Sequence, residues 1–366
     1  MATFFNSYGL LFFVPLGLTI VVTPMMSSLA RRLDFVDRPG RHKTHENMIP
    51  LLGGLAIYIS IFVAMLFFSS FSTKLITGFI GALILVITGL LDDAYNLKPP
   101  VKLAGQITAA AVVVLFHPAS FQFFINYMED RSLPGVLALL LVIGFIVLMI
   151  NALNIIDGLD GLAAGTAAIV FMAMALIGSL VGSVGSLITL QIVAAGACAG
   201  FLIYNFQPAR IYMGDTGSML LGYLLATSYL MSLQGVVDGS LILGTFFIFG
   251  YPALDISYAI IRRLWRRSSI FKADQGHIHH ILIRLGFSVR QSVLLLYSLS
   301  IVFAGLAVFL LSVEISSAAV VAIGLVTALI TMALFRILTL LSRKKEAAAV
   351  FYEGAGSDLR TKDVEV

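Results

Sequence analysis

Five aspartates adjoin apolar segments of this chain, at positions where a carboxylate needs either an interfacial location or a function. Asp92 and Asp93 end the segment GLLDD, Asp157 and Asp160 lie in NIIDGLDG, and Asp215 lies in YMGDTGS. An ionisable side chain at the centre of a bilayer costs about 2.5 to 3.5 kcal/mol on insertion scales. With a single cysteine in the chain, this oxygen-rich set suits Mg²⁺, with Mn²⁺ as an alternative, better than zinc or copper.

Basic residues gather in the same connecting segments. They are His42, Lys43 and His45 in RHKTHEN, Lys102 in PVKLAGQ, Arg210 in QPARIY, and His277, His279, His280 and Arg284 in HIHHILIR. A metal ion combined with basic residues is what phosphoryl transfer between two anions requires, because the reactants would otherwise repel each other. Two other interpretations stay open: a zinc site for the histidines, which lack cysteine partners, and solvated charge at the interface.

Two local spacings sharpen this prediction. Asn154, Asp157 and Asp160 are three residues apart, so neighbouring members would share a helix face and converge on one ligand, unless the intervening glycines break the helix. Further on, an apolar spacing of i, i+3, i+4 and i+7 predicts a short helix lying on the membrane, formed by Ile278, Ile281, Leu282 and Leu285. On another face of that helix, His277, His280 and Arg284 could meet a diphosphate.

The elements that must position these residues are membrane-spanning helices. The chain has 366 residues, of which 59% are hydrophobic and 11% charged, and its mean hydropathy is +1.01, which excludes a soluble globular protein. Because a span needs about 20 apolar residues, the sequence predicts an all-α polytopic integral membrane protein with ten to eleven transmembrane helices. The predicted spans are 7–28, 51–69, 75–91, 101–117, 133–152, 160–181, 186–204, 217–233, 240–261, 291–312 and 316–341. Residues 1–345 would form one transmembrane domain, and residues 346–366 a disordered cytoplasmic tail.

The distribution of basic residues predicts the orientation. If the spans alternate, the loops around 29–50, 92–100, 153–159, 205–216 and 262–290 share one face with the C-terminal tail. Every lysine and arginine except Lys74 and Arg131 lies on or near that face. This bias places the face, and with it the active site, in the cytoplasm, with the N-terminus outside and the C-terminus inside. The basic run from Arg262 to Arg267 would anchor on anionic lipid.

Asp255 differs from the other aspartates because it lies deeper in a predicted span. It precedes Arg262 by seven residues, or about 10 Å at 1.5 Å per residue, and should face the interior of the bundle. A structural hydrogen bond and a catalytic role are equally compatible with this position.

At these residues the chain resembles the polyprenyl-phosphate N-acetylhexosamine-1-phosphate transferase family, in particular its bacterial undecaprenyl-phosphate N-acetylglucosamine-1-phosphate transferases. The resemblance runs through five ordered motifs, from RHKTHENMIPLLGG at Arg41 to HIHHILIRLGFS at Ser288. It implies a multi-pass protein of the inner (plasma) membrane that catalyses the first membrane step of cell-envelope polysaccharide synthesis. In that step, undecaprenyl phosphate attacks the β-phosphorus of a UDP-N-acetylhexosamine, with UDP-GlcNAc favoured, and the products are the lipid diphosphate-sugar and UMP.

The resemblance also implies a role for each candidate residue. Asn154 and Asp215 would hold the magnesium ion, while Asp157 would line the nucleotide pocket and Asp160 would read the uracil. Asp92 and Asp93 would lie near the lipid phosphate, and Lys102 would hold a phosphate. Because a phosphate monoester with a second pKa near 6 is largely ionised at pH 7, we expect Asp92 to position the phosphate and not to abstract a proton. Substrate-binding roles would fall to Lys43, His45, His277, His279, His280 and Arg284, the last four on the diphosphate and sugar.

Two departures from related families narrow the substrate. The muramyl-pentapeptide enzymes have a DDxxK spacing and three consecutive histidines, whereas this chain has DDAYNLK and HIHH, which favours the GlcNAc branch. UDP-GalNAc or another modified donor stays open, since it would need only a few changed contacts worth about 1 to 3 kcal/mol. An ion-coupled transporter and a CDP-alcohol phosphotransferase are remote alternatives. No nucleic-acid partner is expected, and the oligomeric state stays open, a homodimer included.

Overall fold

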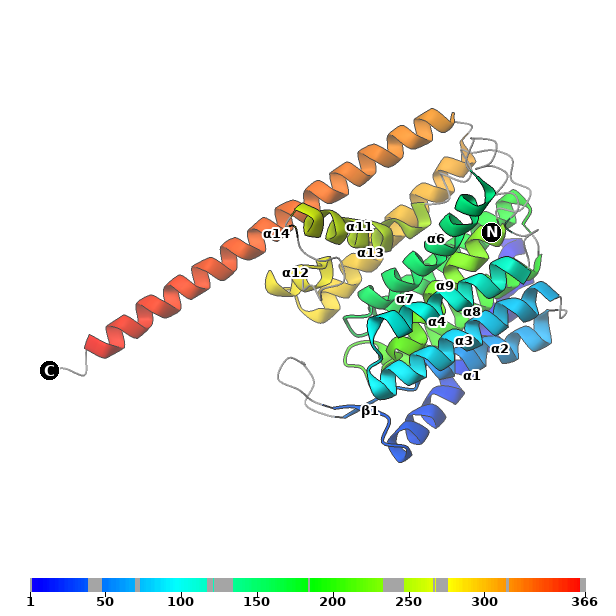
Figure 1. Ribbon diagram of the computed structural model, residues 1–366, viewed down its shortest axis with the longest axis horizontal. Helices are drawn as coiled ribbons and strands as arrows, with labels where there is room; N and C mark the ends of the chain where they lie inside the picture. Colours follow the sequence, from blue (N-terminus) through cyan, green and yellow to red (C-terminus); the bar gives the residue numbers. More distant parts are fainter. Residues whose placement is uncertain are drawn as a thin grey trace.

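The computed structural model describes residues 2–38, 48–69, 73–116, 121, 134–183, 185–232, 247–265, 267, 276–313 and 316–362. Apart from the 3₁₀ turn η1 (Phe247–Phe249) and two short strands, its regular elements are α-helices (Figure 1). The helices are α1 (Ala2–Arg32), α2 (Gly53–Phe68), α3 (Thr73–Tyr95), α4 (Pro99–Phe116), α6 (Gly135–Ile156), α7 (Leu162–Val181), α8 (Gly185–Asn205), α9 (Gly214–Ser232), α11 (Gly250–Trp265), α12 (Ile278–Arg284), α13 (Val289–Ser312) and α14 (Ser317–Lys362). The prediction of an all-α polytopic membrane protein is confirmed.

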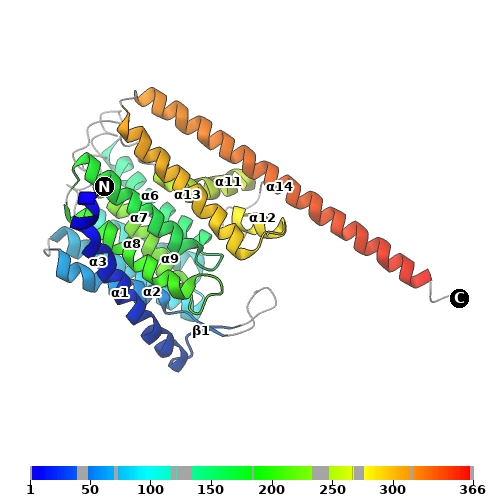
Figure 2. The same cartoon turned by 180° about the vertical axis from the view of Figure 1, so that it is seen from behind.

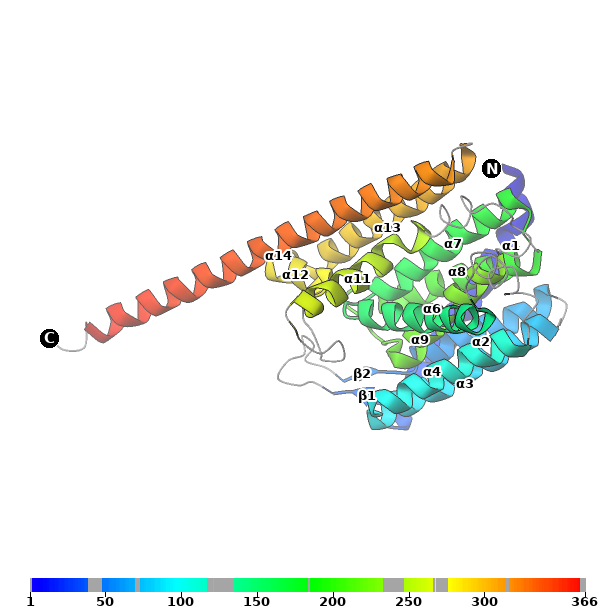
Figure 3. The ribbon, with the colours of Figure 1, turned by 45° about the horizontal axis from the view of Figure 1, so that its top comes forward.

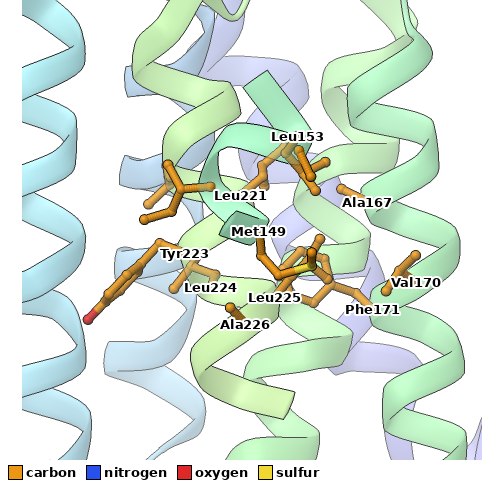
Figure 4. Packing of buried hydrophobic residues seen from close by; sticks show 14 of the residues in the cluster. Met149, Leu153, Ala167, Val170, Phe171, Leu221, Tyr223, Leu224, Leu225 and Ala226 are labelled. Atoms are coloured by element: carbon orange, nitrogen blue, oxygen red, sulfur yellow. The ribbon is translucent and has the colours of Figure 1, made fainter. Parts of the chain in front are cut away.

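Helix α9 forms the centre of the bundle. It contacts α2, α3, α4, α6, α7 and α8, and its side chains from Thr216 to Met231 are all buried. Met149 of α6 and Phe171 of α7 lie beside Leu225 of α9 in this core (Figure 4). On one side of the bundle lie α13 and α14, and on the opposite side lie α3 and α4 (Figures 2 and 3). The charged N-terminal end of α9 is therefore surrounded by the ends of other helices.

Eight of the described helices are long and apolar enough to cross a membrane: α1, α3, α4, α6, α7, α8, α13 and α14. Helices α2, α9 and α11 also coincide with predicted spans but fall outside these eight. Helices α2 and α11 have only 16 residues each, and α9 begins with the polar sequence GDTGS, which lowers its hydropathy. The number of spans beyond the eight stays a prediction.

Glycines set the close approach of α9 to the helices on one side. A Cβ at Gly54 of α2 would collide with the backbone of Gly217, and one at Gly89 of α3 would collide with the backbone of Thr216. Both contacts lie in the first turn of α9. They bring Asp215 next to the end of α3, where Asp92 and Asp93 lie.

A small backbone-paired region holds the loop before α9. Strands β1 (Val36–Asp37) and β2 (Ile49–Pro50) are antiparallel, with Val36 opposite Pro50. The Tyr212 N–H then donates to the Pro50 carbonyl at 2.8 Å, and the Gly53 N–H donates to the Tyr212 carbonyl at 3.0 Å. This pairing cannot be predicted from the sequence, because a strand of two residues is too short to show an alternation of apolar and polar side chains.

Two expectations about surface segments differ from the structure. The short helix predicted after residue 277 is present as α12, but Ile278, Ile281 and Leu282 pack into the protein core and not on the membrane. Arg262, expected on anionic lipid, is buried and donates to the Gly276 carbonyl. The division into a transmembrane domain at residues 1–345 and a disordered tail at residues 346–366 stays a prediction.

Candidate active site at one end of the bundle

Four predicted residues from four different helices meet at one end of the bundle. Asp92 near the end of α3, Lys102 near the start of α4, Asn154 near the end of α6 and Asp215 at the start of α9 are joined by hydrogen bonds. We call these four residues the carboxylate cluster. Residues that are up to 123 positions apart in the chain thus form one polar site. The sequence predicted this convergence for the motifs that carry Asp92, Asn154 and Asp215.

The ammonium group of Lys102 lies at the centre of this cluster. Lys102 Nζ is 3.2 Å from Asp92 Oδ2 and 3.2 Å from Asn154 Oδ1, and it also contacts Asp215 Oδ2. Side-chain oxygens from three helices therefore converge on one cation. Such charge-assisted hydrogen bonds are about twice as strong as neutral ones, so the two carboxylates are held in place before any substrate binds.

Asp215 and Asn154 are also bonded directly to each other. The Asn154 amide donates to Asp215 Oδ1 at 2.7 Å and to Ser218 Oγ at 2.9 Å. One helical turn deeper, the Asn151 amide donates to Gln106 Oε1 at 2.7 Å. These deeper residues close the inner side of the cluster.

Sequence reasoning missed three of these residues. Ser218 follows Asp215 by three positions, Asn151 precedes Asn154 by three, and Gln106 follows Lys102 by four. Each shares a helix face with a residue that was predicted. Polar side chains at i±3 and i+4 within apolar spans were the signal that would have found them.

Asp93 has a different task from Asp92, although the two are adjacent. Its carboxylate accepts hydrogen bonds from the Asp215 N–H at 2.8 Å, the Thr216 N–H at 3.2 Å and the Thr216 hydroxyl at 2.7 Å. It therefore caps the N-terminus of α9 from another helix, where a negative charge also complements the helix dipole. Gly214 has φ +65°, and a Cβ there would collide with the Asp93 carboxylate.

The turn between α6 and α7 carries Asp157 and Asp160. Asp160 Oδ2 accepts a hydrogen bond from the Ala209 N–H at 2.9 Å, while the Gly161 N–H donates to Asn205 Oδ1 at 3.1 Å. Burial raises the pKa of Asp157 well above its usual range, and the nearby negative charges, first among them Asp215, act in the same direction. Asp157 thus keeps its proton to a higher pH than an exposed aspartate does.

A cavity of about 850 Å³ opens beside Asp160. Its walls include Tyr212, Arg210 and Gln207 from the loop before α9, and Arg31 from the end of α1. Burial raises the pKa of the Tyr212 hydroxyl, so this ring stays neutral at physiological pH. Arg210, expected to supply positive charge, lies on the wall of this cavity and is exposed. A cavity with an aromatic ring, a carboxylate and two guanidinium groups suits an anionic ligand that carries a heterocycle.

The histidines lie on residues 276–284, which we call the histidine segment. His279 is 1% exposed, and a Cβ on Gly158 would lie 2.5 Å from His279 Nε2, so this imidazole reaches the turn that carries Asp157. Burial, followed by the charge of His280, lowers the pKa of His279 to about 3. The His279 and His280 ring centroids are 4.2 Å apart. The structure thus brings the histidine segment to the same end of the bundle as the predicted aspartates.

Three predicted residues lie outside the described part of the chain: His42, Lys43 and His45. Within the described part, no three His, Cys, Asp or Glu side chains are arranged to hold a metal ion, so the zinc interpretation of the histidines gains no support there. The carboxylate cluster fits a magnesium ion better, because this ion uses one or two carboxylates and takes its other oxygens from substrate and water.

Comparison with known proteins places these motifs in a family. Residues 75–233 match the model of glycosyl transferase family 4. The chain is 36% identical to the probable undecaprenyl-phosphate N-acetylglucosaminyl 1-phosphate transferase of Bacillus subtilis, over 83% of this chain and 85% of the relative. It is 35% identical to the decaprenyl-phosphate N-acetylglucosaminephosphotransferase of Mycobacterium leprae (76% and 78%) and 30% identical to the undecaprenyl-phosphate alpha-N-acetylglucosaminyl 1-phosphate transferase of Thermotoga maritima (78% and 85%).

Proposed function

This chain belongs to glycosyl transferase family 4, and on that basis we propose that it transfers N-acetylglucosamine 1-phosphate from UDP-GlcNAc to undecaprenyl phosphate. An oxygen of the lipid phosphate forms a bond to the β-phosphorus of the donor. The bond between this phosphorus and the oxygen that bridges it to the α-phosphorus breaks, and UMP leaves with that oxygen. The product, undecaprenyl diphosphate-GlcNAc, would begin the synthesis of a cell-envelope polysaccharide.

The observation that carries this proposal is the convergence of Asp92, Asn154 and Asp215 on one ammonium group. Two phosphate-bearing reactants must meet here, and each carries negative charge. The carboxylates alone would repel them, whereas a site built to hold a cation neutralises them. Lys102 supplies one such cation and would bind a phosphate oxygen of either reactant.

Magnesium would add the second cation. When bound, it supplies Lewis-acid charge neutralisation on the diphosphate. Asp215 and Asn154 are the residues we assign to it, because their carboxylate and amide oxygens lie side by side next to the Lys102 ammonium. Mn²⁺ has the same preference for oxygen ligands and would substitute.

Asp92 would position the reactants and not remove a proton. Its two oxygens are already used, one by the Lys102 ammonium and the other by the Leu97 N–H at 2.8 Å. The lipid phosphate is largely ionised at pH 7 and can attack without a base. Raising the pH should therefore fail to rescue Asp92→Asn in a UMP-release assay. Recovery in step with ionisation of the phosphate would instead assign Asp92 as the base.

The nucleotide would bind beside the turn after α6. Asp160 and Tyr212 line the cavity there, and a uracil ring needs one hydrogen-bonding carboxylate and one flat surface. The substrates of the relatives are polyprenyl phosphates in their printed names, which supports a bilayer-embedded acceptor. The comparisons do not favour UDP-GalNAc or a transporter.

The location of the site supports a cytoplasmic active face. Arg31 and Arg32 end α1, and Arg262 and Arg263 lie in the last turn of α11. Arg31 lines the cavity beside Asp160, so basic residues gather at the end of the bundle that carries the site. The inner membrane, with the N-terminus outside and the C-terminus inside, is the arrangement that we propose.

The proposed reaction is tested with purified protein in detergent. We expect UMP release from UDP-GlcNAc that requires both undecaprenyl phosphate and Mg²⁺, with UDP-GalNAc as the comparison donor. A folded protein that releases no UMP from any UDP-N-acetylhexosamine would overturn the proposal.

A further inference from the structure

Asp255 uses both oxygens of its buried carboxylate on the histidine segment. Asp255 is 1% exposed; its Oδ2 is 3.0 Å from His277 Nδ1, and its Oδ1 accepts the Ile278 N–H at 3.0 Å. The Oδ1 atom already accepts the Ile278 N–H, and we assign the proton shared between Oδ2 and the ring to His277 Nδ1, so that both carboxylate oxygens accept. Nε2 is then the ring nitrogen of His277 that can meet a ligand.

A second residue of α11 holds the same segment two helical turns further along. Arg262 donates to the Gly276 carbonyl at 2.5 Å, and a Cβ on Gly276 would collide with its guanidinium. The guanidinium lies 5.2 Å from the centre of the Tyr258 ring. Residues seven apart share a helix face, so one face of α11 holds residues 276–278 through both Asp255 and Arg262.

These two contacts with α11 fix residues 276–278 and, with them, the position of His279. The His277 and His279 rings are nearly parallel, with an interplanar angle of 9° and centroids 5.9 Å apart. His279 then reaches Gly158, one residue after Asp157. His279 Nδ1 has no hydrogen-bond partner among the described residues. A shift at residue 277 would therefore move the imidazoles relative to the turn that carries Asp157.

We propose that Asp255 and Arg262 are positioning residues, through which α11 fixes His277 and His279 against the Asp157 turn for sugar-phosphate transfer. This inference rests on the proposed function and on the role that the family resemblance implies for the histidines, which is to hold the diphosphate and sugar of the donor. In this proposal Asp255 and Arg262 would not contact the substrate themselves. Both act through the backbone of residues 276–278 and the His277 ring.

The decisive variant is Asp255→Asn. An amide has one accepting oxygen, so it cannot satisfy both the His277 ring as Nδ1–H and the Ile278 N–H. If its oxygen keeps the Ile278 N–H, its NH₂ donates to Nδ1 and the proton of His277 moves to Nε2. We expect kcat to fall about 10- to 100-fold, as is typical when a residue that orients a functional histidine is changed. The KM for undecaprenyl phosphate should stay within about twofold, since His277 would meet the donor.

The matched control is Thr339→Val on α14, which removes the hydrogen bond of 3.1 Å between Thr339 and Tyr258 of α11, the helix that carries Asp255. Both variants change a buried polar contact of α11, so equal losses of thermal stability and of kcat would mean a structural role only. Histidine-selective ¹⁵N NMR supplies a readout independent of turnover: the His277 signal should report Nδ1–H in the wild type and in Thr339→Val, and Nε2–H in Asp255→Asn.

The outcomes separate this inference from the proposed function. A wild-type rate in Asp255→Asn, or an unchanged His277 signal, would overturn the positioning role while lipid-dependent UMP release by the wild type still stood. Loss of kcat with an altered His277 signal, beside an active Thr339→Val, would support it. A wild type that is folded but releases no UMP would overturn the proposed function and, with it, the link between positioning and transfer.

Discussion

The carboxylate cluster and the histidine segment reach the same end of the bundle by different means. In the cluster, Asp92, Lys102 and Asp215 come from packed helices, and opposite charges satisfy one another. In the histidine segment, Asp255 and Arg262 of α11 form hydrogen bonds with the backbone, and the His279 ring is neutral and buried. We therefore expect the cluster to lose function when a charge is removed, and the histidine segment to lose function when it is displaced.

Removing the charge of Asp215 should have the largest effect. Its carboxylate contacts both Asn154 and Lys102, and it is a proposed magnesium ligand. Asp215→Asn should lower kcat by about 10³-fold or more, because charge stabilisation in the transition state is lost. UMP release measures the rate and a thermal melt measures folding. Thr227→Val, which loses only a hydrogen bond within α9, is the control. Near-normal turnover of Asp215→Asn at ordinary magnesium would remove Asp215 from the cation site.

Displacing the histidine segment should have a smaller effect. Gly158→Ala would place a Cβ 2.5 Å from His279 Nε2, so the imidazole must move away from the Asp157 turn. We expect a loss of about tenfold in kcat/KM for UDP-GlcNAc, since a misplacement of about 1 Å costs up to 100-fold. Gly144→Ala in α6 is the control, because a Cβ there meets no atom within 4 Å. Equal kinetics in the two variants would show that His279 need not lie against Gly158.

The smallest effect concerns the pH dependence of stability. The pKa of His279 falls from 6.5 to about 3 in the folded protein. Below pH 6.5 His279 is protonated in the unfolded chain but stays neutral in the folded protein. The free energy of unfolding therefore falls as the pH falls from 6.5 towards 3. At about 1.4 kcal/mol per pH unit, the loss by pH 5 is about 2 kcal/mol.

The variant His279→Gln cannot titrate at this position. Thermal melts at pH 8 and pH 5 should therefore show a smaller drop for this variant than for the wild type. Identical drops would mean that the imidazole is protonated in the fold, and the contrast between a neutral histidine segment and a charged cluster would be lost.

The two regions also differ in how far sequence could predict them. Asp92, Asn154 and Asp215 were predicted as one site, because ionisable and strongly polar side chains beside apolar spans are rare unless they serve a function. Their pairing through Lys102 was not predicted, since contacts between helices depend on packing that spacing does not record. Asp93 shows the same limit: adjacent to Asp92 in sequence, it caps α9.

For the histidine segment, spacing predicted the helix but not what covers its apolar face. Ile281 lies in the core because α13 and α14 pack over α12, and periodicity alone does not distinguish a protein surface from a membrane surface. The role of Asp255, left open by its depth in the span, is set by two contacts with residues 277 and 278. Lys43 and His45 stay predictions, since they lie outside the described residues.

The most direct test of the account follows the β-phosphorus of the donor. UDP-GlcNAc labelled with ³²P at the β-phosphate is incubated with the protein, Mg²⁺ and undecaprenyl phosphate, and lipid and nucleotide are then separated. We expect the label to enter the lipid and unlabelled UMP to be released in equal amount. Label that stays in a nucleotide, as UDP, would mean that the sugar alone is transferred, which would contradict phosphosugar transfer at the carboxylate cluster.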